Sequence, residues 1–206
     1  GVLFLDEFPE FSRAVLENLR QPLEDGLVTV SRAAGSVTFP ARFILVASMN
    51  PCPCGFVSDP GIACTCTPNA ILKYQQKISG PLLDRIDLRV DVPRVAFDEL
   101  NSTAHGESSA HIRERVTRVR ALTASRYTSL RVFTNAEIRT ATLQRYCALS
   151  TDGLTLMKSA MDRLRLSARS YGRILKVART IADLSESEAI TADHLAEALQ
   201  YRVLTT

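Results

Sequence analysis

Two short apolar runs, each followed at once by polar residues, constrain the fold of this chain most strongly. Val2–Leu5 and Phe43–Ala47 are continuous apolar segments, which is typical of strands buried on both faces of a sheet. Asp6 and Glu7 come directly after the first run, and Asn50 follows the second. Ligands bind at the carboxyl ends of strands in α/β sheets, so the two carboxylates are predicted to stand at a ligand-binding edge.

A helix and a hairpin are predicted between the two runs. Apolar residues at helical spacing predict a helix over Arg13–Leu23, with Ser12 as its N-cap and Gly26 at its end. Two β-rich segments around a basic, Gly-containing tip then predict a β-hairpin. Its strands are Leu27–Val30 and Ser36–Phe39, and its tip carries Arg32. Farther along, the alternating segment Leu88–Val92 predicts a third strand of the sheet.

The chain divides by pattern into two domains. Strands that alternate with a helix predict an α/β layered domain over residues 1–97. Residues 98–110 are polar and Ser-rich, and they predict a linker. Residues 111–206 show helical spacing throughout, which predicts an all-α domain. The predicted helices there are marked by Ile112, Val116 and Val119, by Leu154, Met157, Met161 and Leu164, by Tyr171, Leu175, Ala178 and Ala182, and by Leu195, Ala198 and Leu199, the last capped by Thr191.

Charge and composition narrow the classes of protein. The net charge of the 206 residues is +3, with nine Lys and Arg against ten Asp and Glu in residues 1–97 and sixteen against twelve in the rest. The mildly basic second half is compatible with nucleic acid. No apolar stretch has the length of about 18 residues that a membrane span needs, and the start has no basic segment or cleavage site of a signal peptide. We therefore expect a cytoplasmic protein without a membrane partner, and the opening in mid-strand without Met suggests a truncated chain.

The two carboxylates after the first run suit metal binding and the activation of a water molecule. Asp6 is placed to hold Mg²⁺ beside nucleotide phosphates, through water, because Mg²⁺ prefers oxygen ligands and keeps part of its hydration shell. Glu7 is placed to polarise the water that attacks a γ-phosphate. The alternative is an ordinary strand that ends in a charged turn.

Four segments in order resemble those of AAA+ ATPases of the magnesium-chelatase-like, ComM/YifB type. Gly1–Glu7 resembles the Walker B motif, and Ile44–Pro51 resembles the sensor-1 strand, in which Asn50 would lie between the Walker B acid and the γ-phosphate. Ser79–Asp87 is similar to the segment whose Arg acts in the neighbouring subunit's site, and Arg85 is the matching residue. Leu166–Leu184 is similar to the sensor-2 helix of the lid, where Arg169 matches the phosphate-contacting position.

The resemblance covers nearly the whole chain and implies a partial AAA+ core followed by a helical lid. It further implies ATP and Mg²⁺ as cofactors, assembly with copies of itself into a ring, typically a hexamer, and a DNA helicase that promotes branch migration. One departure is large, because no G-x-x-x-x-G-K-[ST] phosphate-binding loop occurs in the sequence. Little ATP hydrolysis is therefore expected of this chain alone. For Arg85, a simple pairing with Asp84 or Asp87 is the alternative.

A cysteine cluster and the hairpin tip are the remaining candidate sites. Four Cys side chains could hold a structural Zn²⁺, and reduced thiols without metal are the alternative; they are Cys52, Cys54, Cys64 and Cys66. The fifth, Cys147, is expected in a core. The hairpin resembles the pore hairpin of AAA+ helicases, so Arg32 is a candidate DNA-phosphate contact, with an exposed turn residue as the alternative. A basic helix face near Arg113 and Arg120 is typical of a solvated surface.

Three other functions are compatible with parts of the sequence. A magnesium chelatase subunit would show similar nucleotide motifs. An enhancer-type transcription activator shares the hairpin but carries a Trp-containing lid segment, and this chain has no Trp. A non-catalytic assembly or zinc-binding module would use the cysteines without turnover.

Overall fold

The computed structural model describes residues 1–33, 35–95, 106–130 and 132–202. These form two compact units, residues 1–86 and residues 87–206, and each is considered separately. The predicted linker, residues 98–110, lies largely outside the described residues, and the predicted boundaries at residues 97 and 111 stay predictions. Among the residues described, no helix is both long and apolar enough to cross a membrane.

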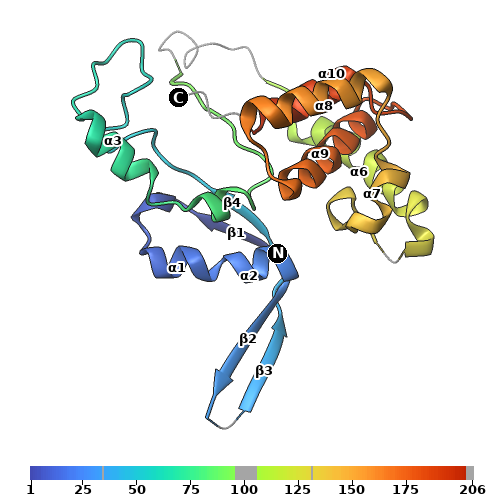
Figure 1. Ribbon diagram of the computed structural model, residues 1–206, viewed down its shortest axis with the longest axis horizontal. Helices are drawn as coiled ribbons and strands as arrows, with labels where there is room; N and C mark the ends of the chain where they lie inside the picture. The colour runs from blue at the N-terminus through green and yellow to red at the C-terminus, as the bar shows by residue number, and fades with distance from the viewer. Residues whose placement is uncertain (34, 96–105, 131, 203–206) are drawn as a thin grey trace. The chain divides into compact units, whose positions relative to one another are not determined.

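A two-stranded parallel sheet forms the centre of the first unit. Strand β1 spans Val2–Leu5 and pairs with β4, Ile44–Ala47, with Val2 opposite Ile44 and Leu5 opposite Ala47. The two strands confirm the prediction from the apolar runs. Both strands run in the same direction, so their carboxyl ends lie at the same edge of the sheet (Figure 1).

The expectation that both faces of these strands are buried was wrong. Val2 and Phe4 of β1 are 67% and 60% exposed, because side chains on a strand alternate between the two faces and the described helices cover only one. On the covered face, Leu5 and Leu45 pack against a small core formed by Phe8, Leu16, Ile78 and Leu82.

The predicted helix over residues 13–23 is divided into two. Helix α1 spans Arg13–Asn18 and α2 spans Arg20–Asp25, with Leu19 as the junction. Pro22 explains the break, because a proline has no N–H to donate to the carbonyl four residues earlier and its ring collides with that carbonyl. Ser12 caps α1 by accepting a hydrogen bond from the Val15 N–H, as predicted. Gly26 ends α2 in the left-handed conformation, with φ of 67°.

The predicted hairpin is present and longer than predicted. Strand β2 covers Leu27–Arg32 and β3 covers Gly35–Pro40, paired antiparallel from Leu27 opposite Pro40 to Arg32 opposite Gly35. The hairpin extends away from β1, β4 and α1 (Figure 1). Its faces are exposed, and cross-strand hydroxyl pairs stabilise it, including Thr29 with Thr38 at 3.0 Å.

The remaining elements of this unit are short. A 3₁₀ turn, η1, spans Phe8–Glu10, and helices α3 and α4 span Pro68–Gln75 and Gly80–Leu83. The long connection from β4 to α3 contains no helix or strand.

The predicted strand over Leu88–Val92, in the second unit, was wrong. The segment is irregular, and the side chains of Val90 and Val92 are 67% and 85% exposed. A strand needs a neighbour to pair with, and no described strand lies beside this segment. One backbone bond, from the Arg89 N–H to the Tyr201 carbonyl at 3.1 Å, anchors it.

The second unit is otherwise helical, as predicted. Its helices are α6 (Ser109–Arg126), α7 (Thr140–Tyr146), α8 (Thr151–Leu164), α9 (Ala168–Leu184) and α10 (Ala192–Gln200), with 3₁₀ turns η2 (Thr128–Leu130) and η3 (Asn135–Glu137). The Leu175 and Ala178 side chains of α9 and Leu195 of α10 lie in the core, with Cys147, as expected. The Thr191 cap of α10 is confirmed. In α6, by contrast, the predicted apolar face is largely exposed.

A buried carboxylate joins three segments of this helical unit. Asp183 of α9 accepts two bonds from the Arg126 guanidinium, at 2.7 and 2.8 Å, and one from Arg179 at 3.1 Å. The Asn135 side chain donates another at 2.8 Å. Burial alone would raise the pKa of Asp183, but the hydrogen bonds from Arg126 and Asn135 and the nearby positive charges outweigh it and lower this pKa below its usual value.

We expect Asp183→Asn to destabilise the protein by about 3 kcal/mol at neutral pH, because Arg126 and Arg179 would be left without their buried counter-charge. The deficit should be constant above about pH 5 and shrink below about pH 4, where the wild-type carboxylate becomes protonated through its lowered folded-state pKa. Urea unfolding across this range measures it. The exposed-pair control Glu114→Gln should cost under about 1 kcal/mol. Equal stability of Asp183→Asn and wild type at pH 7 would contradict the assignment.

Candidate active site

The polar residues that follow β1 and β4 meet at the carboxyl edge of the sheet. The Ser48 hydroxyl donates a hydrogen bond to Asp6 Oδ1, and the Glu7 N–H donates to the same oxygen at 3.0 Å. The backbone adds two bonds, from the Ser48 N–H to the Leu5 carbonyl at 3.0 Å and from the Phe8 N–H to the Ser48 carbonyl at 2.8 Å. Asp6 is therefore held in a fixed orientation at an exposed edge.

Asp6 keeps one oxygen available for a ligand. Both of its hydrogen bonds fall on Oδ1, and within the described part of the chain Oδ2 makes none. A free carboxylate oxygen beside a hydroxyl is a donor set that suits a hard cation such as Mg²⁺. The residues present thus fit the predicted magnesium role of Asp6.

Glu7 has an unusual backbone conformation for a side chain of its size. Its φ of 50° and ψ of 46° place it in the left-handed region, which costs roughly 1–2 kcal/mol for a residue other than glycine. The bonds made by its own N–H and by the Phe8 N–H hold the turn in this conformation. Such strain gathers at functional sites, and the Glu7 side chain is exposed.

Asn50 lies two residues beyond Ser48, at the same edge of the sheet. Two residues of α3 contact the segment around it. The Gln75 side chain donates to the Pro51 carbonyl at 3.4 Å, and the Asn50 backbone lies close enough to Tyr74 to act on its pKa. Tyr74 is buried, and this burial, with the charges of Glu10 and Glu7 nearby, raises its pKa.

Arg85 is paired inside the first unit. Its guanidinium donates to the Glu24 carboxylate of α2 and, at 2.6 Å, to the Pro81 carbonyl. Only 8% of the Arg85 side chain is exposed. Glu24, which the sequence did not suggest, is thus an ion-pair partner of Arg85.

Arg169 lies in the first turn of α9, in the helical unit, and is exposed. Two cations on the same helix have structural partners. Arg173 contacts Asp87 at 2.6 Å, and Lys176 donates to the Ala136 carbonyl at 2.9 Å. Burial, together with the charge of Arg173, lowers the pKa of Lys176. At the hairpin, Arg32 ends β2 and is exposed beside the tip.

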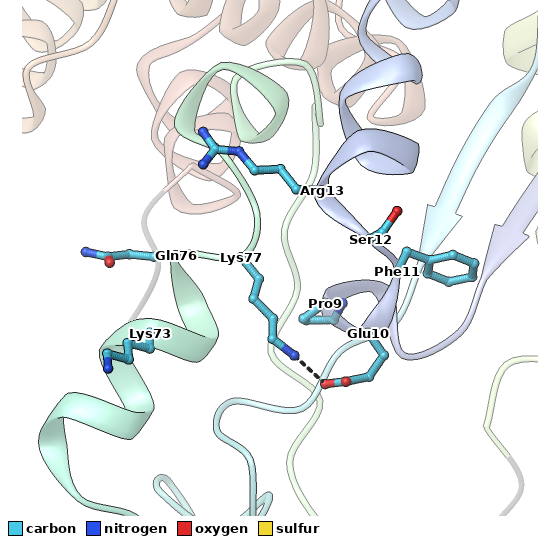
Figure 2. Close-up of a pocket in the computed structure, with 8 residues that line it drawn as sticks. All are labelled: Pro9, Glu10, Phe11, Ser12, Arg13, Lys73, Gln76 and Lys77. Carbon is cyan, nitrogen blue, oxygen red and sulfur yellow. Dashed lines mark hydrogen bonds and ion pairs between the residues drawn. The ribbon is translucent and has the colours of Figure 1, made fainter.

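An open hollow of about 430 Å³ lies between the turn after Glu7 and helix α3 (Figure 2). Lys77 reaches across it to Glu10, with Nζ 3.0 Å from Oε1. Arg13 and Lys73 also line it. None of the site residues predicted from the sequence lines this hollow. The ion pair between Lys77 and Glu10 links the end of α3 to the turn that follows Glu7.

The four clustered cysteines converge. The Sγ atoms of Cys52, Cys54 and Cys64 lie 3.4, 3.5 and 3.8 Å apart, and Cys66 completes a set whose sulfurs all lie within 4.8 Å of one another. All four are free thiols. The backbone at Phe56 and Thr65 lowers the pKa of Cys54 to about 5, whereas burial and the neighbouring thiols raise the pKa values of Cys64 and Cys66.

Two residues of the site escaped the sequence analysis. No role was predicted for Ser48, although its position directly after an apolar strand was a usable signal. Glu24 is different, because nothing in the sequence indicates that α2 faces residue 85. Its pairing depends on the tertiary fold.

The chain is similar to proteins of one family over nearly its whole length. The family model for magnesium chelatase, subunit ChlI, matches residues 1–100, and the model for the ChlI C-terminal region matches residues 106–202. The competence protein ComM of Haemophilus influenzae is 45% identical over 205 residues, and YifB of Escherichia coli is 42% identical. Each alignment covers 99% of this chain, which spans 39% of the length of these relatives. A Mycobacterium tuberculosis protein is 42% identical over 98% of the chain, which covers 40% of that relative. The chain belongs to the magnesium chelatase-like family, together with the proteins of the ComM and YifB type.

Proposed function

We propose that this chain is part of an ATP-dependent AAA+ motor, a ComM-type DNA helicase that drives branch migration during DNA uptake and recombination in the cytoplasm. The family suggests an ATPase activity for the whole protein. The observation that carries the proposal is the edge of the β1–β4 sheet, where Asp6 is oriented by Ser48 and Glu7 is held in a strained turn. This chain has no phosphate-binding loop sequence, so the activity is proposed for the whole protein.

Each residue at this edge has a distinct task in the proposed reaction. Asp6, oriented through Oδ1, would hold Mg²⁺ with its free oxygen, and the ion would offset the charge of the ATP phosphates. The exposed Glu7 carboxylate would orient a water molecule and accept its proton. Asn50, an uncharged amide, would position that water without competing for the cation. In the helical unit, the exposed Arg169 would contact phosphate as part of the lid.

The hairpin supports DNA as the substrate of the motor. It extends from the first unit with both faces exposed, and a positive charge lies at its end (Figure 1). An Arg at such a tip would contact phosphates rather than bases, which suits a motor that moves along any sequence. The Haemophilus influenzae relative is named as a competence protein. We further propose a homohexameric ring, in which Arg85 acts on the neighbouring subunit's nucleotide.

Replacement of Glu7 by Gln should lower ATP turnover of the whole protein by at least about 10²-fold, because the group that accepts the water's proton is lost. Nucleotide binding should remain. Turnover and binding of a fluorescent ATP analogue are measured in parallel. The matched control is Glu10→Gln, which removes a carboxylate of the same turn that pairs with Lys77, and it should keep turnover within a few-fold. Full activity of Glu7→Gln would exclude the catalytic role.

Arg85→Ala should also lower turnover by about 10²-fold or more if the guanidinium acts on a neighbouring subunit's phosphate. Mixing Arg85→Ala with Glu7→Gln tests whether the two residues act across a subunit interface. In a ring assembled at random from equal amounts of the two variants, about a quarter of the head-to-tail interfaces combine an intact Glu7 with an intact Arg85. Activity should therefore reappear in the mixture. Glu24→Gln, which removes only the ion-pair partner, is the control and should stay active. Two results together would contradict this role: the mixture shows no recovery of turnover, and Arg85→Ala and Glu24→Gln lose the same amount of turnover. The Arg85–Glu24 pair would then serve stability alone.

Arg32→Ala should weaken binding of branched DNA and reduce the salt dependence by about one counterion, while ATP turnover without DNA stays unchanged. Binding is measured by fluorescence anisotropy at several salt concentrations. Arg42→Ala, a change outside the hairpin tip, serves as the control and should leave the salt slope unaltered. If the wild type hydrolyses ATP but DNA neither binds nor stimulates, the chelatase function replaces the helicase. If it neither hydrolyses ATP nor responds to DNA, the non-catalytic module replaces both.

A further inference from the structure

The connection between β4 and α3 is stabilised by a few turn hydrogen bonds and by very little side-chain burial. Residues 48–67 contain no helix or strand, and Cys52 is the only buried side chain among them. Loops longer than about 12–15 residues without secondary structure are uncommon in compact domains unless they have a function. One buried side chain does not offset the conformational entropy of fixing such a length of chain. The ordered course of this loop therefore requires another stabilising interaction.

The arrangement of the four cysteine sulfurs supplies it. Cys52, Cys54 and Cys64 form a triangle of sulfurs with sides of 3.4, 3.5 and 3.8 Å. Cys66 lies within 4.8 Å of all three, so the four sulfurs are close enough together to share one metal ion. With Zn–S bonds of about 2.3 Å, a tetrahedral site has sulfurs about 3.8 Å apart. A disulfide would need about 2.05 Å.

From this geometry we propose that the four cysteines bind one structural Zn²⁺, which fixes the loop of residues 51–67. Four thiols lose their protons to solvent and four S–Zn bonds form, so no oxidant or reductant is required. Thiolate ligands in a tetrahedral set select zinc over magnesium or calcium. The four sulfurs leave no open position, so the site is structural and separate from the magnesium chemistry at Asp6.

The proposed metal also helps to position Asn50, an inference that rests on the proposed function. Cys52 lies two residues after Asn50, and Cys66 directly precedes Thr67, the N-cap of α3. Helix α3 in turn contacts the Asn50–Pro51 segment through Tyr74 and Gln75. The metal therefore joins the start of the loop, next to Asn50, to its end, next to α3. Both ends influence where Asn50 lies, so the metal fixes the position of that residue.

The test measures zinc in the whole protein, purified without chelator, by inductively coupled plasma mass spectrometry. Wild type should carry about one zinc more per chain than Cys54→Ser or Cys64→Ser. Cys147→Ala is the matched control, since Cys147 is buried in the helical unit, and it should keep the full zinc content. Equal zinc in wild type and in the loop variants, or iron in place of zinc, would overturn the proposal.

A second measurement uses only wild-type protein, in case a loop variant fails to fold. An organic mercurial that caps thiols should release one zinc per chain, detected by a colorimetric zinc indicator, and protease should then cut within residues 51–67. If the native protein exposes all four loop thiols to a disulfide reagent and releases no zinc, the site is refuted.

ATP turnover separates the metal site from the proposed function. Metal removal should reduce the turnover rate more than the affinity for ATP, because Asn50 acts on the reacting water. Zinc release with unchanged turnover would reject the positioning role and keep the site. Bound zinc in a protein without any ATP turnover would reject the proposed function and keep the site.

Discussion

Parallel pairing of β1 with β4 is the interaction on which the candidate site depends. It brings the ends of two segments about forty residues apart in the chain to one edge, with Leu5 opposite Ala47. A shift of register would separate Ser48 from Asp6 and remove the bonds that hold the turn at Glu7. Each backbone bond contributes only about 1 kcal/mol. Together, the Ser48 N–H bond to the Leu5 carbonyl, the Phe8 N–H bond to the Ser48 carbonyl and the Ser48 hydroxyl bond to the Asp6 carboxylate offset the strain at Glu7.

The same reasoning explains which features were predictable from sequence. Apolar runs located β1 and β4 because a short run of consecutive apolar residues is a strong local signal for a strand, and the spacing of the later helices did the same for the second unit. Leu88–Val92 shows the limit of such signals. Its alternation is that of a strand, yet a strand also needs a neighbour, which alternation does not report. The break at Leu19 was predictable from Pro22 and was missed by attending to the apolar face alone.

The contacts of charged residues were the least predictable features. Motif resemblance located Arg85, but its pairing with Glu24 depends on how α2 packs near α4, which no local pattern encodes. Asp183 is similar. It lies in a helix with strong apolar periodicity, and only the fold shows that Arg126, Arg179 and Asn135 surround it. Buried charges are tolerated only when several partners come together, so their positions are set by tertiary structure and not by spacing.

The cysteine loop combines a feature predictable from sequence with one that only the tertiary fold shows. Its sequence spacing indicated a metal, while only the structure shows that the four sulfurs lie within 4.8 Å of one another and that Cys52 is the one buried side chain of residues 48–67. A hydrophobic core could not replace the metal here, because residues 48–67 run over the surface between a sheet edge and a helix. Four S–Zn bonds to a single ion can order such a segment without burying its side chains. The Asn50 side chain can thus stay exposed while its backbone is held on one side by β4 and on the other by the cysteine loop and α3.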